Sequence, residues 1–323
     1  MPAPERIPEV GLSTVVPQGH DPRDVEALLH GELSVKGRIR DASNAVLFCE
    51  AVHEGRAVAC VYKPAAGERP LWDFPDGTLA RREVAAYLVS EATGWGLVPP
   101  TVLRDGPFGE GMVQLWIDAQ DEVRDEPHAG ADDARTTDAG GTEHAEHAGD
   151  AGDAGDAGDL LGLGVGALLA LTEDPEPAPG WKAVVRAELE DGRPVLLVHA
   201  DDARLRRLAV LDAVLNNADR KGGHLIAAPG GRLYGIDHGV TFHTDDKLRT
   251  LLWGWAGAPL PAEAQVVLEK LAGELSGALG ERLAPLITPA ELDALRARVR
   301  SLLDTGRHPE PGGDWPSIPW PPV

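Results

Sequence analysis

Hydrophobic and polar residues alternate in three short runs in the first fifth of the chain. A period of two is typical of β-strands that bury one face and expose the other. Polar and glycine-containing segments separate the runs, as expected between strands. The pattern therefore predicts a small sheet built from three strands, at residues 33–40, 45–52 and 57–63.

The second and third of these runs flank Glu54 and Gly55, a pair that favours a two-residue hairpin turn. Pairing about that turn places Cys49 opposite Cys60. A cross-strand disulfide is one interpretation of this pair. Two cysteines give no disulfide framework, however, and a cytosolic chain favours two buried thiols.

Apolar residues recur at helical spacing both before and after these three runs in the sequence. Residues 22–30 predict a short helix, and residues 77–95 a longer one that Thr78 can cap. The apolar run 112–118 predicts a buried strand.

Periodic patterns resume near residue 160. Two strands are expected around the turn Asp191-Gly192, and Asp201 or Asp202 can cap the amphipathic helix that follows. A hairpin and two further helices complete this part, with strands at 223–228 and 232–236 and helices at 262–279 and 289–304.

The composition changes between the two parts. Residues 118–159 contain 14 acidic and 2 basic residues, so they carry −12 of the net charge of −22. Repeated Ala-Gly-Asp triplets offer too little apolar surface to order the segment. We therefore expect a disordered insertion at 119–159, and we favour this over metal binding by its histidines, His128, His144 and His147.

The net charge of the chain limits the kinds of molecule that it is expected to bind. A net charge of −22 argues against a nucleic-acid-binding protein, which usually carries a basic face. The chain shows neither an apolar run of about 18 residues nor a charged and apolar leader. A cytoplasmic protein that is not an integral membrane protein is expected, while its oligomeric state stays open.

Lys63 ends the third predicted strand. Val61 lies on the same face, and the hairpin register places Val46 opposite Lys63. This arrangement provides an aliphatic floor with a lysine at its edge, which suits a nucleotide base followed by phosphates. Glu83, on the next helix, can hold the lysine in an ion pair, although a strand-end lysine and a helix-surface acid are ordinary alternatives.

A second polar group follows the helix expected at 201–217. Asp219 and Lys221 lie in one loop with His224, and Asp237 follows the predicted hairpin, which returns the chain to that loop. An acid that orients a hydroxyl, a lysine that contacts the γ-phosphate and two metal ligands would together form a phosphoryl-transfer site. The alternative is that these are turn residues, which Asp and Gly favour on backbone grounds alone.

These motifs together resemble those of the protein-kinase-like superfamily. The order is VYK at 61–63, Glu83, a linker strand, DRKGGH at 219–224 and IDHG at 236–239. The segment NNADRKGGHLI and the later YGIDHG are similar to the catalytic region of phosphatidylinositol 3- and 4-kinases. The chain also resembles an actinobacterial family described as phosphatidylinositol kinase-like, over about residues 30–120 and 160–300.

The resemblance implies an α+β fold of two lobes, a small antiparallel-sheet N-lobe and a mainly helical C-lobe. It divides the chain into an N-terminal extension, the N-lobe, the insertion, the C-lobe and a tail rich in proline and tryptophan, at residues 1–30, 31–118, 119–159, 160–306 and 307–323.

The resemblance also implies the role of each candidate residue. Lys63 would hold the α- and β-phosphates of ATP, Asp219 would orient the acceptor hydroxyl, and Lys221 is the lysine for the γ-phosphate. A divalent ion, Mg²⁺ or Mn²⁺, would bind His224 and Asp237. The base would lie between Val46, Val61 and the linker strand, formed by Gln114, Leu115, Trp116, Ile117 and Asp118.

Two features depart from the family pattern. The turn between the first two strands has no glycine-rich loop, so Ser43 and Asn44 are the candidates for phosphate contacts, or else form an ordinary polar turn. His224 stands where the kinase pattern has a metal-binding asparagine. Magnesium prefers oxygen ligands, whereas imidazole suits softer divalent ions.

The expected function is transfer of the ATP γ-phosphate to an unidentified hydroxyl acceptor, which is a lipid, a protein or a small molecule. The alternatives are a nucleotide-binding pseudokinase or scaffold, and an enzyme that transfers the adenylyl group. Between residues 238 and 255 the basic residues only balance the acidic ones, which disfavours an anionic lipid acceptor.

Overall fold

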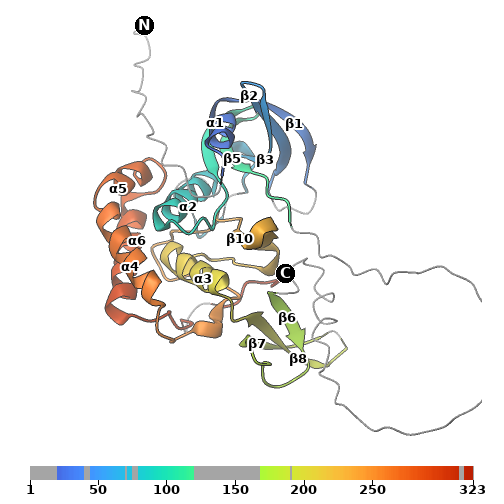
Figure 1. Cartoon of the computed structure of the whole chain (residues 1–323), viewed down its shortest axis with the longest axis vertical. Helices are drawn as coiled ribbons and strands as arrows, with labels where there is room; N and C mark the ends of the chain where they lie inside the picture. Colours follow the sequence, from blue (N-terminus) through green and yellow to red (C-terminus); the bar gives the residue numbers. More distant parts are fainter. Residues whose placement is uncertain are drawn as a thin grey trace, which may run out of the picture.

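The fold is of the mixed α+β class, with antiparallel sheets and several helices (Figure 1). The computed structural model describes residues 20–39, 44–69, 71–74, 79–119, 168–189, 191–312 and 316–322. Ser43, Thr78 and residues 120–159 of the expected insertion lie outside the described residues.

A five-stranded antiparallel sheet forms the first part, in the order β1-β2-β3-β5-β4. The β2–β3 turn has positive φ at Glu54 (47°) and Gly55 (80°), as the expected hairpin requires. Cys49 pairs with Cys60 in the expected register, and both are free, buried thiols. The strands are β1 Glu32–Arg38, β2 Leu47–His53, β3 Arg56–Pro64, β4 Thr101–Gly106 and β5 Gly109–Leu115.

The helix expected at 22–30 is confirmed as α1, Pro22–His30, and it covers one face of this sheet. Asp21 caps it by accepting a hydrogen bond from the amide of Arg23. Ala27 and Leu28 pack against the paired cysteines and Tyr62 in one apolar cluster. The buried positions that alternate along β2 and β3 are therefore the ones that pack against this helix.

The expected strand at 112–118 is wrong at its boundaries. The strand β5 begins at Gly109 and ends at Leu115, and Trp116 is already outside it. The edge strand β4 was not predicted from the sequence, because its second half, Arg104 to Gly106, is partly or fully exposed and lacks an apolar repeat. Edge strands bury less surface and so carry a weaker pattern.

Helix α2, Leu79–Thr93, lies on the other side of the sheet and faces the second part of the chain (Figure 1). Glu68 caps the N-terminal end of this helix. The two carboxylate oxygens of Glu68 accept hydrogen bonds from the amides of Leu79 and Ala80. Eleven of its 15 residues are buried. The helix is therefore a core element between the two parts.

The second part begins with the antiparallel sheet β6-β8-β7. Asp191 and Gly192 form the expected turn between β7 and β8. Helix α3 follows, and Asp202 caps it, as one of the two expected residues. These elements are β6 Leu169–Thr172, β7 Trp181–Glu188, β8 Pro194–Ala200 and α3 Ala203–Leu215.

The core of the second part forms around α3. Its five residues expected to point inward are all at most 2% exposed: Leu205, Leu208, Leu211, Val214 and Leu215. The expected hairpin is present as β9 Leu225–Ala228 and β10 Arg232–Gly235.

The helix expected at 262–279 is wrong as one element. It divides at Ser276 and Gly277 into α4, Ala262–Leu275, and α5, Ala278–Leu283. Arg296 donates two hydrogen bonds to the carbonyl of Leu275, which satisfies the end of α4. The last expected helix is confirmed as α6, Pro289–Thr305, with a capping box at its start.

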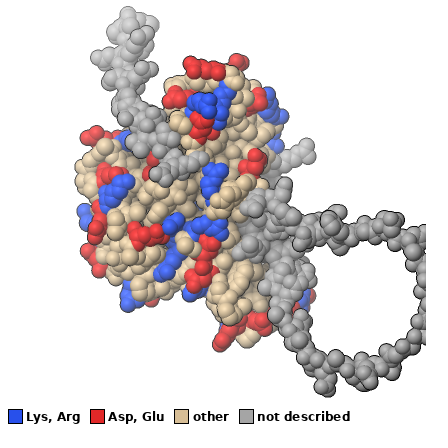
Figure 2. Space-filling model, viewed as in Figure 1, with Lys and Arg blue, Asp and Glu red and all other residues tan. Residues whose placement is uncertain are grey.

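The surface drawn in Figure 2 mixes both signs of charge, with Lys and Arg side chains lying next to Asp and Glu. Within the described residues, no helix is long and apolar enough to cross a membrane.

Candidate functional site

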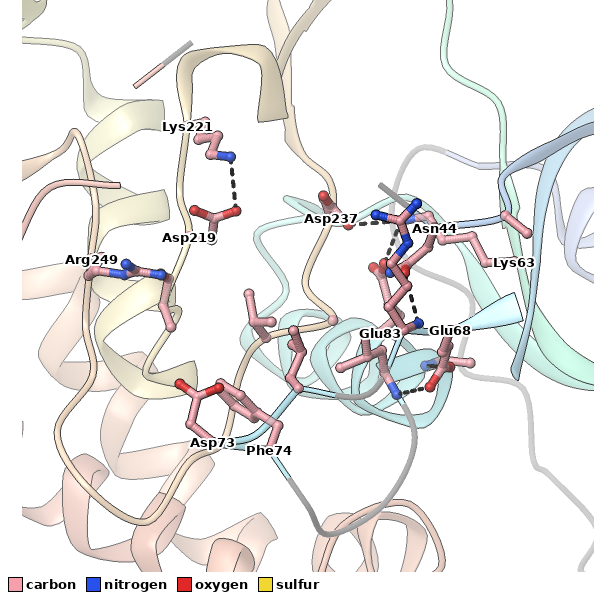
Figure 3. A pocket seen from close by; sticks show the side chains of 18 of the residues that line it. Asn44, Lys63, Glu68, Asp73, Phe74, Glu83, Asp219, Lys221, Asp237 and Arg249 are labelled. Atoms are coloured by element: carbon pink, nitrogen blue, oxygen red, sulfur yellow. Dashed lines mark hydrogen bonds and ion pairs between the residues drawn. The ribbon is translucent and has the colours of Figure 1, made fainter. Parts of the chain in front are cut away.

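A cavity of about 480 Å³ lies where the β3 end of the first sheet faces the loops after α3 and β10. Six residues expected from the sequence line it (Figure 3), namely Asn44, Lys63, Glu83, Asp219, Lys221 and Asp237.

Lys63 is the centre of the ion-pair network in this cavity. Its Nζ lies 2.7 Å from Glu83 Oε1 and 2.8 Å from Asp237 Oδ1. Burial opposes the charge of Lys63, but the carboxylates of Asp237 and Glu83 outweigh it and raise the pKa. The lysine is therefore a fixed cation at the cavity wall.

Glu83 connects this lysine to the loop after β10. The residue is 2% exposed, and its second oxygen, Oε2, accepts a hydrogen bond of 2.9 Å from the amide of His238. Burial raises the pKa of Glu83, and Lys63 opposes that shift. Glu83 thus fixes the lysine and the backbone beside Asp237 at the same time.

Asp237 has a positive φ of 60°, which is uncommon for a residue other than glycine. Its side chain is half exposed, so the carboxylate is open on the cavity side while one oxygen binds Lys63. Lys63 lowers the pKa of Asp237 below its usual range. Strained backbone of this kind is found at functional sites.

Asp219 lies across the cavity from this network (Figure 3). The side chain of Asn217 accepts a hydrogen bond from its amide, and Lys221 Nζ lies 3.3 Å from its Oδ2. Burial raises the pKa of Asp219, and Lys221 only partly offsets this effect. A partly buried carboxylate with a raised pKa is suited to accept or orient a proton.

A buried ion pair holds this loop in place. Arg220 and Asp212 are both fully buried, and two hydrogen bonds of 2.9 Å join them. Arg220 also donates to the carbonyl of Ile236 and to His238 Nε2, so it connects the loop to the residues around Asp237. The pair was not predicted from the sequence, where only the adjacency of Arg220 to Asp219 pointed to it.

His224 lies beside Asp237, with its Nε2 3.4 Å from Asp237 Oδ2. Burial lowers the pKa of His224 to about 4, so the imidazole is neutral near pH 7, as a metal ligand must be. Within the described residues, no group of three or more His, Cys, Asp or Glu side chains converges on one point. The two residues fit a divalent ion only if phosphate oxygens complete its coordination.

Arg82, beside Glu83 on α2, is a second buried cation that the sequence did not indicate. The residue is 2% exposed, lies 2.5 Å from Glu291 of α6 and donates to the carbonyl of Thr241. Its guanidinium also lies over the ring of Phe74, which lines the cavity. Arg82 therefore connects α2 to α6 and to the loop after Asp237.

The residues expected to hold the base are described but are not among those lining the cavity. The amide nitrogen of Gln114 donates to Thr101 Oγ1 between β5 and β4. Trp116 packs edge to face on Phe48, and its Nε1 donates to Asp118. Val46, Val61, Leu115 and Ile117 are likewise not among the cavity-lining residues.

Comparison with known proteins identifies a relative that is similar over most of the chain. Protein Rv2133c of Mycobacterium tuberculosis is 48% identical over 295 residues, which cover 91% of this chain and 93% of that protein. No protein-family model matches the chain.

Proposed function

We propose a function from the residues of this chain, which belongs to the same family as protein Rv2133c of Mycobacterium tuberculosis. We infer that the chain is an ATP-dependent phosphotransferase on a two-lobed, protein-kinase-like fold related to phosphatidylinositol 3- and 4-kinases. It transfers the γ-phosphate to a hydroxyl acceptor.

One observation carries the proposal, namely the network in which Lys63 binds both Glu83 and Asp237. Phosphoryl transfer in kinases requires a strand lysine held by a helix glutamate, together with an acid that binds the metal. Here the three groups come from β3, from α2 and from the loop after β10. Three segments that are distant in the sequence bring these groups together, which supports a role in binding a triphosphate.

The architecture supports the same proposal. A five-stranded antiparallel sheet with α2 at its side precedes the part that holds α3 and α4–α6 (Figure 1). In this proposal, the first group belongs to the expected N-lobe, 31–118, and the second group to the expected C-lobe, 160–306. Lys63 and Glu83 lie in the first group, and Asp219 and Asp237 lie in the second.

In the proposed reaction, Asp219 orients the acceptor hydroxyl and Lys221 contacts the γ-phosphate. The acceptor oxygen forms a new bond to the γ-phosphorus, and the bond from that phosphorus to the β,γ-bridging oxygen breaks. ADP leaves with the electron pair, and the hydroxyl proton passes to Asp219 or to solvent. Such catalysis consists mainly of positioning and charge stabilisation.

A divalent ion, Mg²⁺ or Mn²⁺, would bind His224, Asp237 and the phosphates. When bound, it neutralises developing charge on the phosphates. Arg69, exposed at the cavity edge beside Asn44, is a further candidate phosphate contact. The adenine would lie beyond Lys63 along β3, toward Val61, where side chains of the linker strand must move to admit it.

A second candidate is a nucleotide-binding scaffold without transfer activity. One observation favours it, since Asp237, Glu83 and Asp219 are each already paired with a lysine. A bound nucleotide and its metal would have to displace Lys63 from Asp237 for transfer to occur.

Incubation with ATP labelled on the α- or the γ-phosphate separates these candidates. Label from the γ-phosphate in protein, lipid or small-molecule products supports the phosphotransferase. Label from the α-phosphate identifies adenylyl transfer, and ATP binding without either identifies the scaffold. Lys63→Met abolishes transfer in our proposal, whereas Lys36→Met, at an exposed lysine of the same sheet, retains it.

A further inference from the structure

The segment 316–322 is fixed beside the loop that carries Asp219. The amide of Gly222 donates to the carbonyl of Pro322 at 3.0 Å, and the carbonyl of Ser317 accepts from the amide of Thr250 and from Trp253 Nε1. Pro319, between these anchors, is buried. The segment is therefore attached on both sides of Trp320.

Trp320 itself is 84% exposed, yet it lines the cavity that also contains Asp219 and Lys221. Because its backbone is anchored on both sides, an exposed tryptophan here can offer its ring to a ligand without the cost of ordering the segment. Its place beside the acid proposed to orient the acceptor assigns it to the acceptor side of the cavity.

The same anchors disfavour an extended peptide as acceptor. An extended peptide that binds by pairing with an exposed backbone segment needs free backbone hydrogen-bond donors along that segment. Beside Asp219, the amides of Gly222 and Thr250 are already bonded to residues 317 and 322.

The charged side chains on this side of the cavity each have a contact already. Asp219 faces Lys221, Asp73 lies 3.0 Å from Lys247, and Arg249 donates to the carbonyl of Ala218. A charged acceptor would have to compete with one of these contacts. An uncharged acceptor with many hydroxyl groups can instead hydrogen-bond to the paired groups without separating them.

We propose that this side of the cavity, between Asp219, Asp73 and Trp320, binds a soluble, uncharged ring polyol, such as a sugar or a cyclitol. The ring would present its C–H face to Trp320 and its hydroxyl groups to the carboxylates. This inference rests on the proposed phosphotransferase function. The product is the polyol phosphate, formed when one hydroxyl oxygen replaces ADP on the γ-phosphorus and its proton passes to Asp219 or solvent.

The test measures transfer of labelled γ-phosphate to D-glucose, D-galactose, D-mannose, D-ribose and myo-inositol, each added separately to the full chain with ATP and Mn²⁺ or Mg²⁺. We expect at least one of them to be phosphorylated. Trp320→Ala should raise the KM for that polyol by about tenfold, the size of a stacking contact, and leave the KM for ATP unchanged. Phe108→Ala is the matched control, because Phe108 is also an exposed aromatic residue, at 56%, but is not among the cavity-lining residues.

Two parallel reactions identify other acceptors, one with phosphatidylinositol vesicles and one with a serine-containing peptide. Label in either of these alone overturns the inference. So does ATP turnover without label in any of the five polyols, although the proposed phosphotransferase then still stands. Equal polyol KM values for Trp320→Ala and Phe108→Ala overturn the role of Trp320. A chain that does not bind ATP at all overturns the proposed function and with it this inference.

Discussion

Asp237 Oδ1 lies 2.8 Å from Lys63 Nζ, although 174 positions separate the two residues in the chain. The contact joins the first sheet to the loop after β10 across the cavity. The candidate site therefore exists only when the two groups of elements are docked on one another, and α2 fixes that docking through Glu83 and Arg82.

Lys63→Met should abolish the stabilisation of the chain by ATP. A ligand that binds only the folded state at 100 times its Kd stabilises by about 2.7 kcal/mol, and Lys63 is the cation proposed to hold the phosphates. Thermal melting with and without ATP and a divalent ion measures this effect. Lys36→Met should keep the full ATP-dependent shift, and retention of the shift in Lys63→Met would remove Lys63 from the binding site.

Arg220→Met should lower the free energy of unfolding by about 3–5 kcal/mol, the usual cost of removing one partner from a buried ion pair. The remaining Asp212 carboxylate would be buried without its partner. The double variant Arg220→Met and Asp212→Leu should recover part of that loss. Urea denaturation of the three variants measures it, and a double variant no more stable than Arg220→Met would contradict this account of the pair.

Asp219→Asn should make the folded chain more stable near neutral pH. The folded pKa of Asp219 is raised above its ordinary value of 3.8, so the stability it contributes is present at low pH and is lost as pH rises through the raised pKa. An asparagine does not ionise and avoids this loss. Melting temperatures of both proteins across pH 3–8 measure the difference, which should disappear at the acidic end; a constant difference would refute the assignment.

His224→Asn should shift the metal preference of γ-phosphate turnover from Mn²⁺ toward Mg²⁺. An imidazole ligand favours softer ions, whereas an amide oxygen suits Mg²⁺. The ratio of turnover rates with the two metals is the relevant measurement. An unchanged ratio would show that His224 is not a ligand and would point to a phosphate contact instead.

Much of the fold was predictable because it depends on local pattern. The Cys49–Cys60 register follows from one turn, and the inward residues of α3 follow from helical spacing. The ion pair between Lys63 and Glu83 was also expected, whereas the contact of Lys63 with Asp237 was not.

The features that were missed depend on contacts between distant segments. Arg82 reaches Glu291, and Glu68 caps α2 from outside it, yet neither residue carries a local signal. Trp320 gains its place only because the tail bonds to Gly222 and Thr250. The residues expected to hold the base do not line the cavity, and Gln114 and Trp116 have partners on neighbouring strands, so their role stays a prediction.

The measurement that tests the central claim most directly is γ-phosphate turnover by Asp219→Asn alongside its ATP affinity. Because Asp219 acts on the acceptor rather than on the nucleotide, ATP binding should remain close to that of the parent, while turnover should fall by about 10²–10⁴-fold. Equal turnover of Asp219→Asn and the parent would contradict the proposed phosphotransferase site.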